Sequence, residues 1–456
     1  MIDDCGLDLS FEISHQYRPF ELIAPGFEQI DSGPAVVTGL ERAGASPVAP
    51  FVAVELDVDD LPESGVTAGL STATGDRVLV SYEPGRGRIA IEVCRDGVNR
   101  VVRAGCASLR APFRLAFVLC ENQVTAVAGT GAGWRPLLSE RGEVARLVDL
   151  REPDTLAEHA FTYGARGDGE VRLAGVRAGP FGYTGVRDPH LVQRPDGTAV
   201  IRDGKAYLTF TCAGMGFFQQ AHWGVFTLEL ACPYRLEQVA QLYSLRDGLL
   251  LGDHAGQLVV DEEHQRTIVG LSSWGDFAYA GVQVRHTVTS ADLLSGVHLL
   301  ETEPLRLPTR VSAWDPSLTR INDRWHVAFV ESPSQDPFSF HPALAVGERG
   351  ASYESGLTLA GSDGSARECE GPIIQQVDGT WYVVASNKDT ERYPVYDLSM
   401  RRLGNLDAPY VTNIPHPQIV NLPDGGHLLV TFNGTQYGHE VLDYGGHGDL
   451  VVMSSQ

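Results

Sequence analysis

The chain has 456 residues, more than one ordinary hydrophobic core can organise, so two domains are expected. Hydrophobic residues make up 43% of it and charged residues 20%, a balance that is typical of globular proteins. The net charge of -23 repels phosphate backbones and anionic lipid surfaces, which argues against nucleic acid or a membrane as a partner. The first residues hold no positively charged segment followed by an apolar run, so a cytoplasmic protein is expected.

Residues 1–178 alternate apolar strands with turns and are predicted to form a β-sandwich of the lectin-like, jelly-roll kind. Strands are expected over 51–58, 77–82, 89–93, 113–119 and 123–128, with a helical turn near 144–159. A carbohydrate-binding module, a wall of an active-site pocket and a plain scaffold all stay open for this domain, because no tight cluster of exposed aromatic residues stands out.

One unit recurs in residues 179–456. It is clearest at Glu370-Gly371-Pro372, where an acid beside a proline precedes an apolar strand, an Asp-Gly turn and a second strand. Asp188-Pro189 and Asp315-Pro316 begin similar units, and His416-Pro417 begins one with histidine in place of the carboxylate. We interpret the three acids as occupying equivalent positions of a repeat.

The spacing of the units predicts a five-bladed β-propeller over residues 179–456. Pro189 lies 127 residues before Pro316, which lies 56 before Pro372, which lies 45 before Pro417. The first interval is about twice the others, so a divergent unit is expected within it, near Asp253-His254. The first strand of each blade lines the central axis, so Asp188, Asp315, Glu370 and His416 should converge at one end of it.

Carboxylates that face each other across a pocket are what cleavage of a glycosidic bond requires. One protonates the leaving oxygen, while the other activates water or attacks the anomeric carbon. A third acid raises the pKa of the residue that must arrive protonated. A single Asp-Pro is more often a turn, but three acids in register within a ring favour a shared site.

The propeller part resembles glycoside hydrolase family 43, the arabinanases, arabinofuranosidases and β-xylosidases. The resemblance rests on Arg187-Asp188-Pro189-His190, Trp314-Asp315-Pro316-Ser317, Glu370-Gly371-Pro372 and Gly445-Gly446-His447-Gly448. It implies that Asp188 is the general base, that Asp315 tunes the acid and positions substrate, and that Glu370 is the general acid. It also implies that His447 binds a calcium or sodium ion, or water, on the axis.

Further residues are candidates for contact with substrate. Trp314, directly before Asp315, could stack on a sugar face, and Arg187 directly precedes Asp188. His416 could donate a hydrogen bond to substrate, or be a histidine satisfied by neighbouring backbone. Asp253 and His254 have no role that the pattern assigns, and the chemistry requires no cofactor.

The sequence therefore predicts an inverting glycoside hydrolase that acts on small furanose or pentose glycosides or oligosaccharides. Inversion would place the carboxyl groups of Asp188 and Glu370 roughly 6.5 to 9.5 Å apart. One alternative is a propeller repurposed for lyase, cyclase or isomerase chemistry on a small metabolite. Another is a sugar-binding propeller without activity. The oligomeric state is left open.

Overall fold

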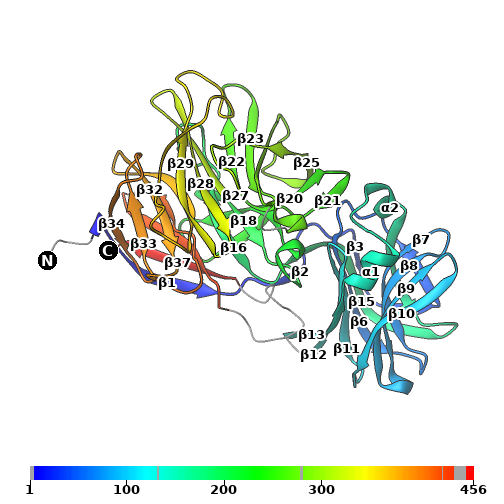
Figure 1. The fold of residues 1–456 in the computed structure, drawn as a ribbon. Coiled ribbons are helices and arrows are strands. Elements are labelled where there is room, and N and C mark those ends of the chain that lie inside the picture. The colour runs from blue at the N-terminus through cyan, green and yellow to red at the C-terminus, as the bar shows by residue number, and fades with distance from the viewer. Residues whose placement is uncertain (1–4, 131–132, 278–280, 424, 436–447, 456) are drawn as a thin grey trace.

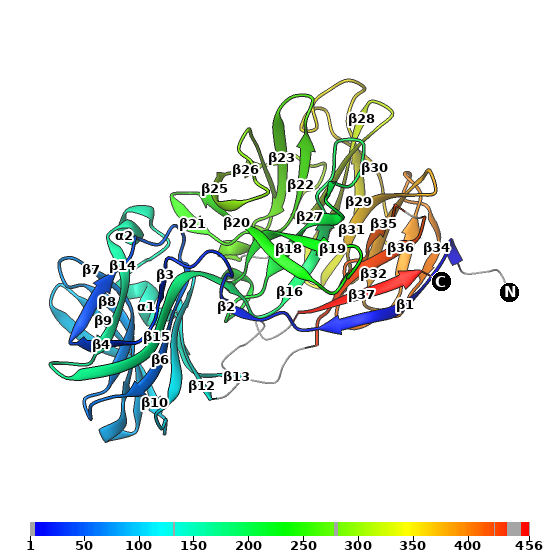
Figure 2. The ribbon, with the colours of Figure 1, turned by 180° about the vertical axis from the view of Figure 1, so that it is seen from behind.

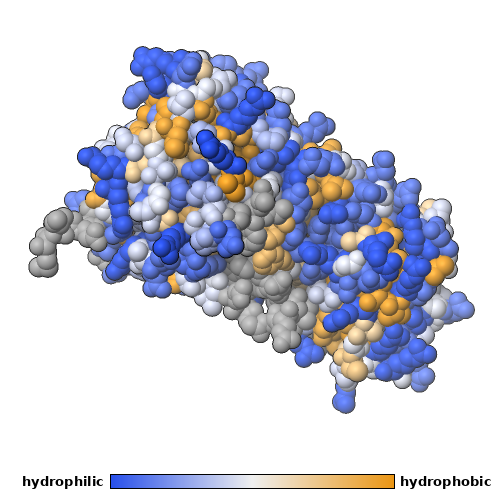
Figure 3. Space-filling view, in the orientation of Figure 1, coloured by the Kyte–Doolittle hydropathy of each residue, from blue (hydrophilic) through white to orange (hydrophobic). Residues whose placement is uncertain are grey.

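The computed structural model describes all residues except 1–4, 131–132, 278–280, 424, 436–447 and 456. The described chain is all-β, with only short helices, and it forms two lobes that lie side by side (Figures 1 and 2). None of the helices in this part of the chain has the length and apolar character needed to cross a membrane. The face seen in Figure 3 is mainly hydrophilic, with apolar residues in separated patches.

The N-terminal lobe contains two antiparallel sheets. The first follows the order β10 (Val98–Cys106), β9 (Arg88–Arg95), β8 (Arg77–Glu83), β7 (Val66–Thr72), β14 (His159–Ala165) and β5 (Leu40–Ala43). The second follows β13 (Gly133–Glu140), β12 (Gln123–Thr130), β11 (Phe113–Cys120), β6 (Phe51–Asp60), β15 (Glu170–Tyr183) and β2 (Glu21–Ile23), while β3 (Ile30–Ser32) and β4 (Ala35–Thr38) also pair with β15.

Side chains from both sheets fill one shared core in this lobe. Leu56, Phe117 and Val124 of the second sheet and Leu70 and Ile91 of the first sheet all belong to it and are fully buried. Alternation of apolar and polar residues thus gives each sheet one apolar face that the other covers. All five predicted strands are present, and the expected helical turn is present as α1 (Gly142–Leu147) and α2 (Pro153–Ala157).

The described strands of the C-terminal lobe, with β1, fall into five antiparallel groups of four. The first two are β16 (Val186–Leu191), β18 (Lys205–Cys212), β19 (His222–Glu229) and β20 (Leu236–Arg246), and then β22 (His254–Asp261), β23 (Arg266–Ser272), β24 (Val284–Thr289) and β26 (Glu303–Pro304). Three short strands, β17 (Ile201–Arg202), β21 (Leu249–Leu251) and β25 (Gly296–Glu301), extend the first group.

The remaining groups come from the later part of the chain. The third is β27 (Ser312–Ile321), β28 (Arg324–Gln335), β29 (Phe338–Val346) and β30 (Thr358–Ser362). The fourth is β31 (Cys369–Val377), β32 (Thr380–Asn387), β33 (Tyr393–Tyr396) and β34 (Arg402–Asp407), and the fifth is β35 (Gln418–Asn421), β36 (His427–Asn433), β37 (Asp449–Ser455) and β1 (Cys5–Tyr17).

Hydrogen bonds between the first strands link consecutive groups and close the circuit. Four of these bonds run from a backbone N–H of one group to a side-chain oxygen of its neighbour: Leu318 to Gln257 (2.6 Å), Ile374 to Ser317 (3.0 Å), Ile419 to Gln375 (2.8 Å) and Leu191 to Gln418 (2.9 Å). Groups one and two are joined by backbone bonds between Gln193 and both Leu258 and Val260. The first strands therefore surround a common centre.

Strand β1 pairs with strands of the C-terminal lobe, although the predicted division at residue 178 assigned it to the N-terminal domain. It pairs antiparallel with β37 along Phe11 to Tyr17, and its first residue pairs with β34 at Asn405. Strand β37 would otherwise be the edge of its group, with unpaired backbone groups. The buried side chains of Leu7 and Phe11 join Leu429 and Val451 in the core of this region. The start of the chain thus completes the last group of strands.

Turn chemistry explains why these hairpins form where they do. Asp378-Gly379 between β31 and β32 has φ angles of 48° and 78°, and Asn322-Asp323 between β27 and β28 has 49° and 64°. Both central residues of such two-residue turns need positive φ, which Gly, Asn and Asp tolerate best. The Asp-Gly signal in the sequence therefore marked a real hairpin.

Candidate active site

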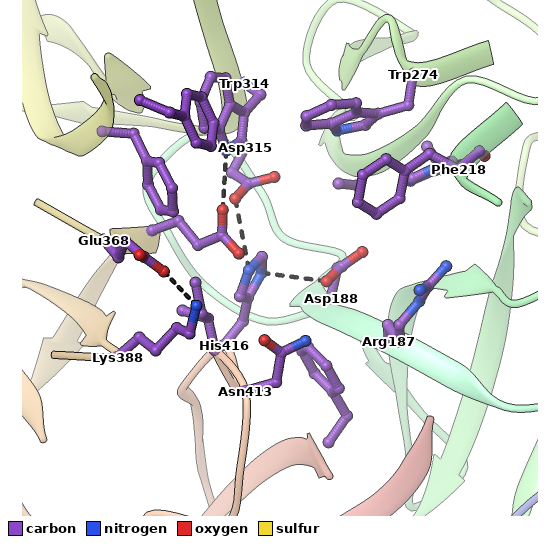
Figure 4. A pocket seen from close by; sticks show the side chains of 17 residues that line it. Arg187, Asp188, Phe218, Trp274, Trp314, Asp315, Glu368, Lys388, Asn413 and His416 are labelled. Carbon is purple, nitrogen blue, oxygen red and sulfur yellow. Dashed lines mark hydrogen bonds and ion pairs between the residues drawn. The ribbon is translucent and has the colours of Figure 1, made fainter. Parts of the chain in front are cut away.

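A cavity of about 200 Å³ opens where the first strands of the groups converge (Figure 4). Its walls include every predicted site residue that the structure describes: Arg187, Asp188, Trp314, Asp315, Glu370 and His416. The other residues of the wall are Phe218, His254, Ala255, Trp274, Phe338, Phe340, Glu368, Lys388, Asn413, Ile414 and Phe432. The predicted residues are thus brought to one place from four of the five groups.

Each of the first four groups interrupts its first strand at the same point. Pairing with the second strand breaks after Arg187, His254, Trp314 and Glu370, and it resumes three residues later. The residue after each break has a left-handed backbone: Asp188 at φ 53°, Ala255 at 51°, Asp315 at 51° and Gly371 at 63°. Such strain in non-glycine residues clusters at functional sites, and bulges of this kind redirect side chains.

This register corrects the sequence interpretation of three equivalent acids. Asp188 and Asp315 occupy the left-handed position, but in the fourth group Gly371 occupies it, so Glu370 is the counterpart of Trp314 and Arg187. In the second group the left-handed position holds Ala255, which has no carboxyl group. Glu370 stands one residue before the left-handed position that Asp188 and Asp315 occupy in their groups. Its side chain is longer than that of Asp, and its carboxyl group lines the same pocket.

Glu370 is set up to carry a proton near neutral pH. Burial, assisted by the negative charge of Asp188, raises its pKa to about 8. The indole N–H of Trp314 donates a hydrogen bond to Glu370 Oε2 at 3.1 Å, and this bond lowers the pKa, so burial is the stronger effect. A carboxylic acid with this pKa is mostly protonated at pH 7 and can donate that proton to a substrate.

Asp315 is the most constrained of the three acids. Its backbone N–H donates to Ser272 Oγ at 2.9 Å, and its Oδ2 accepts the N–H of Gly371 at 3.2 Å. Burial together with the charges of Glu370 and Asp188 raises its pKa well above the ordinary value. Asp315 and Glu370 therefore interact as a pair, because the negative charge of one carboxylate disfavours loss of the proton from the other.

His416 lies between the two aspartates, as Figure 4 shows. Its Nδ1 is 3.7 Å from Asp188 Oδ1 and its Nε2 is 3.5 Å from Asp315 Oδ2. Burial lowers its pKa in spite of the Asp188 charge. A Cβ on Gly371 would come within 2.3 Å of the His416 ring, so only glycine leaves room for the imidazole. The prediction offered a substrate donor or a backbone-satisfied histidine, whereas the ring contacts both carboxylates.

The structure gives roles to Asp253 and His254. Arg246 donates to both oxygens of Asp253, at 2.7 and 2.9 Å, and Gly275 N–H donates to Asp253 at 2.8 Å. This buried pair anchors the short η3 turn (Trp274–Asp276), which carries Trp274 to the pocket. His254 stacks on Trp274 with ring centres 6.4 Å apart, and burial lowers its pKa to about 4. Asp253 is therefore a structural acid and not a fourth catalytic candidate.

Aromatic side chains form a larger part of the wall than the sequence indicated. Trp314 was the single aromatic candidate, yet Phe218, Trp274, Phe338 and Phe340 join it in one side of the cavity and Phe432 lies on another element. Neighbouring rings are in contact, with centres 5.0 Å apart for Phe218 and Trp274 and 5.5 Å for Trp274 and Trp314. Trp325, by contrast, lies in the middle of a strand and is buried in the core.

Lys388 was also missed, although one signal could have found it. Only two lysines occur in the chain, and Lys388 is the one in this cavity. Its ammonium group pairs with Glu368, and its charge lowers the pKa of Glu370. Arg187 lines the same cavity, and its charge contributes to the low pKa of His254 and of His416. Two cations thus balance part of the acidic charge.

His447, the predicted ligand of an axial ion, lies outside the described residues. Among the residues that are described, no three His, Cys, Asp or Glu side chains are grouped as metal ligands. The ion stays a prediction, and the chemistry below does not pass through it.

No protein-family model matches the chain, and no curated protein matches it. Solved structures with some likeness include the three named here. They include the GH43_1 enzyme of Xanthomonas citri complexed with xylose (16% identity, TM-score 0.41, covering 59% of this chain and 86% of that one). They also include the α-L-arabinanase of Penicillium chrysogenum complexed with arabinobiose (10%, 0.38, 90% and 97%) and levansucrase of Bacillus subtilis (10%, 0.43, 60% and 86%). At TM-scores below 0.5 these likenesses carry no argument.

Proposed function

We propose that the chain is a glycoside hydrolase in which Glu370 is the general acid and Asp188 the general base. One observation carries the proposal: Glu370, with a pKa of about 8, shares a cavity with Asp188, a second acid of a different group of strands. Hydrolysis of a glycosidic bond needs one carboxyl group that donates a proton to the leaving oxygen and a second that accepts a proton from water.

In the proposed reaction Glu370 protonates the oxygen of the leaving group as the bond to the anomeric carbon breaks. Asp188 removes a proton from the water that attacks this carbon from the opposite face. The charge of Asp188 is part of what keeps Glu370 protonated. Asp315 and His416 act as positioning residues, because Asp315 is tied to Gly371 and His416 stands against both aspartates. Inversion of the anomeric centre follows from this assignment.

The finer features of the fold belong to the same proposal. The five groups of strands, linked in a closed circuit, are interpreted as the blades of a five-bladed propeller, and the two sheets of the N-terminal lobe as a sandwich. The proposed domains divide at residue 178, except that β1 (Cys5–Tyr17) belongs to the second domain as its closing strand. The proposed substrates are small furanose or pentose glycosides.

A panel of nitrophenyl glycosides tests the proposal. Arabinofuranosides and xylosides are incubated with the protein and with Glu370→Gln and Asp188→Asn, and the first product anomer is identified by NMR. The expected result is release by the parent chain, with inversion, and loss of release in Asp188→Asn. Glu370→Gln should keep part of its turnover on nitrophenyl glycosides, because nitrophenolate leaves without a proton, and should lose turnover on glycosides of alkyl alcohols. Turnover of a non-hydrolytic kind, or tight sugar binding without release, would replace this proposal by the lyase or isomerase alternative or by a binding module.

A further inference from the structure

Aromatic rings form one side of the pocket next to the acid. A general acid protonates the leaving group, so the leaving group must lie against Glu370. Trp314 donates its indole N–H to Glu370 and is therefore a direct neighbour of that position. Around Trp314 lie Phe338, with ring centres 6.4 Å apart, and Phe340, at 5.5 Å. The atoms that leave with the oxygen therefore face aromatic rings.

These rings belong to one continuous series. Phe338 and Phe340 are 5.1 Å apart, and Trp314 connects them to Trp274, which in turn contacts Phe218. Trp314 and Phe340 are almost fully buried, whereas Phe338 is 40% exposed at the start of β29. Phe338 thus offers ring surface at the rim of the cavity that a ligand can cover.

Polar groups lie mainly elsewhere in the pocket. His416 contacts both Asp188 and Asp315, and Arg187 lies on the Asp188 side in Figure 4. Glu368 and Lys388, which flank the acid, are paired with each other. A second sugar could stack one C–H face on these rings, but its hydroxyl groups would find few partners among them, whereas an apolar ring has no such groups to satisfy. The aromatic rings therefore favour an apolar leaving group over a sugar.

We infer that the substrate carries an apolar aglycone about the size of a phenyl ring, held by Trp314, Phe338 and Phe340. This inference rests on the proposed function, since it takes Glu370 as the acid. The polar floor of the pocket, formed by Asp188, Asp315, Glu370 and His416, then holds one sugar residue. The aromatic wall, which comprises Trp314, Phe338, Phe340, Trp274 and Phe218, selects the group attached to that sugar.

The test compares three aglycones on one sugar: benzyl, methyl and a second sugar. Benzyl and methyl alcohol are leaving groups of similar acidity, so differences between them report binding more than chemistry. We expect kcat/KM for the benzyl glycoside to exceed that for the methyl glycoside by about tenfold, as burial of an apolar ring predicts, and to exceed that for the disaccharide. A ratio of benzyl to methyl below about threefold, or preference for the disaccharide, overturns the inference.

Two variants locate the effect. Phe338→Ala removes a half-exposed ring and should lower the ratio of benzyl to methyl kcat/KM to near one. Leu359→Ala removes an apolar side chain that is 46% exposed on β30 of the same group, outside the pocket, and should keep the ratio of the parent chain. An unchanged ratio in Phe338→Ala overturns the assignment to this wall. Absence of cleavage for all three glycosides would instead contradict the proposed hydrolase, and the inference with it.

Discussion

The acidic floor and the aromatic wall of the pocket are built in different ways. Asp188 and Asp315 project from strained positions in first strands, which hydrogen bonds tie into a closed circuit. Phe218 and Trp274 come instead from the short turns η2 (Phe218–Gln220) and η3 that follow the strands. The reacting groups thus stand on the rigid centre of the lobe together with Trp314, while Phe338 and Phe340 stand on β29. Only Phe218 and Trp274 stand on turns that can vary without disturbing the first strands.

The two parts of the wall are also held by different partners. Turn η3 is fixed within the C-terminal lobe by the Arg246–Asp253 pair. Turn η2 is fixed from the N-terminal lobe, because Gln220 donates to Glu121 at 2.8 Å and Gln123 donates to the carbonyl of Met215 at 2.5 Å. The N-terminal lobe therefore contributes to the shape of the pocket without lining it.

Replacement of Glu370 should have the largest effect on turnover, and it leaves the aromatic wall intact. Glu370→Gln should lower kcat by about 10³-fold, because protonation of the leaving group is lost. Circular dichroism should remain that of the parent chain, and benzyl glycoside should still bind in calorimetry. Retention of near-normal turnover would remove Glu370 from its role.

The raised pKa of Glu370 predicts how the free energy of unfolding and the activity depend on pH. With a pKa of about 8 in the folded chain against an ordinary 4.5, Glu370 binds more proton when folded than when unfolded between these values. The free energy of unfolding contributed by this group therefore falls as pH rises from about 4.5 to about 8. Activity should fall above about pH 8, where the acid loses its proton. In Glu370→Gln this part of the pH dependence of unfolding, followed by urea titration, should disappear.

Alanine substitutions at Gly371 and Gly379 distinguish the effect of backbone strain from the effect of displacing His416. Gly371→Ala should displace the His416 ring and lower kcat roughly tenfold to a hundredfold. Gly379→Ala is the matched control, because Gly379 also has positive φ, at 78°, in the same hairpin but has nothing within 4 Å of an added Cβ. Both variants should lose about 1 kcal/mol of stability through the positive φ, and Gly371→Ala should lose more because of the clash with His416, but only Gly371→Ala should lose turnover. Equal activity in the two would show that His416 has no positioning role.

Trp314 belongs to the aromatic wall and also donates a hydrogen bond to Glu370. A substitution that keeps the ring surface but removes the indole N–H tests the hydrogen bond alone. Trp314→Phe keeps an aromatic surface but removes the bond that lowers the pKa of Glu370. We expect kcat/KM at neutral pH to fall roughly tenfold, and the alkaline limb of the pH profile to move to higher pH. Trp325→Phe, which changes a buried tryptophan in the core of the same group, serves as control. A limb that moves to lower pH would contradict the assignment.

The sequence was informative where function depends on local pattern, and less so where it depends on register. Acid beside proline, Asp-Gly turns and spacing were enough to bring Asp188, Asp315, Glu370 and His416 to one cavity. The one-residue offset of Glu370 was not visible, because it depends on where strand pairing breaks. Strand β1 could not be placed either, since its partner β37 lies more than 400 residues away in the chain. Most of the wall beyond Trp314 was missed, because an aromatic ring near a first strand can either line the pocket or fill the space between groups of strands.

The smallest expected effect tests the contribution of the N-terminal lobe to the wall. Gln220 is fully buried, donates to Glu121 and accepts the N–H of Phe217 at 2.8 Å, so it ties the turn that carries Phe218 to the other lobe. Gln220→Ala should raise KM for the benzyl glycoside about threefold and change kcat less than twofold, because the floor is untouched. Asn99→Ala removes a similar bond, from Asn99 to Glu92, on a strand of the N-terminal lobe that does not contact the pocket, and should change neither constant. A fall in kcat with constant KM would mean that η2 acts on the acids, and the separation of floor from wall would then fail.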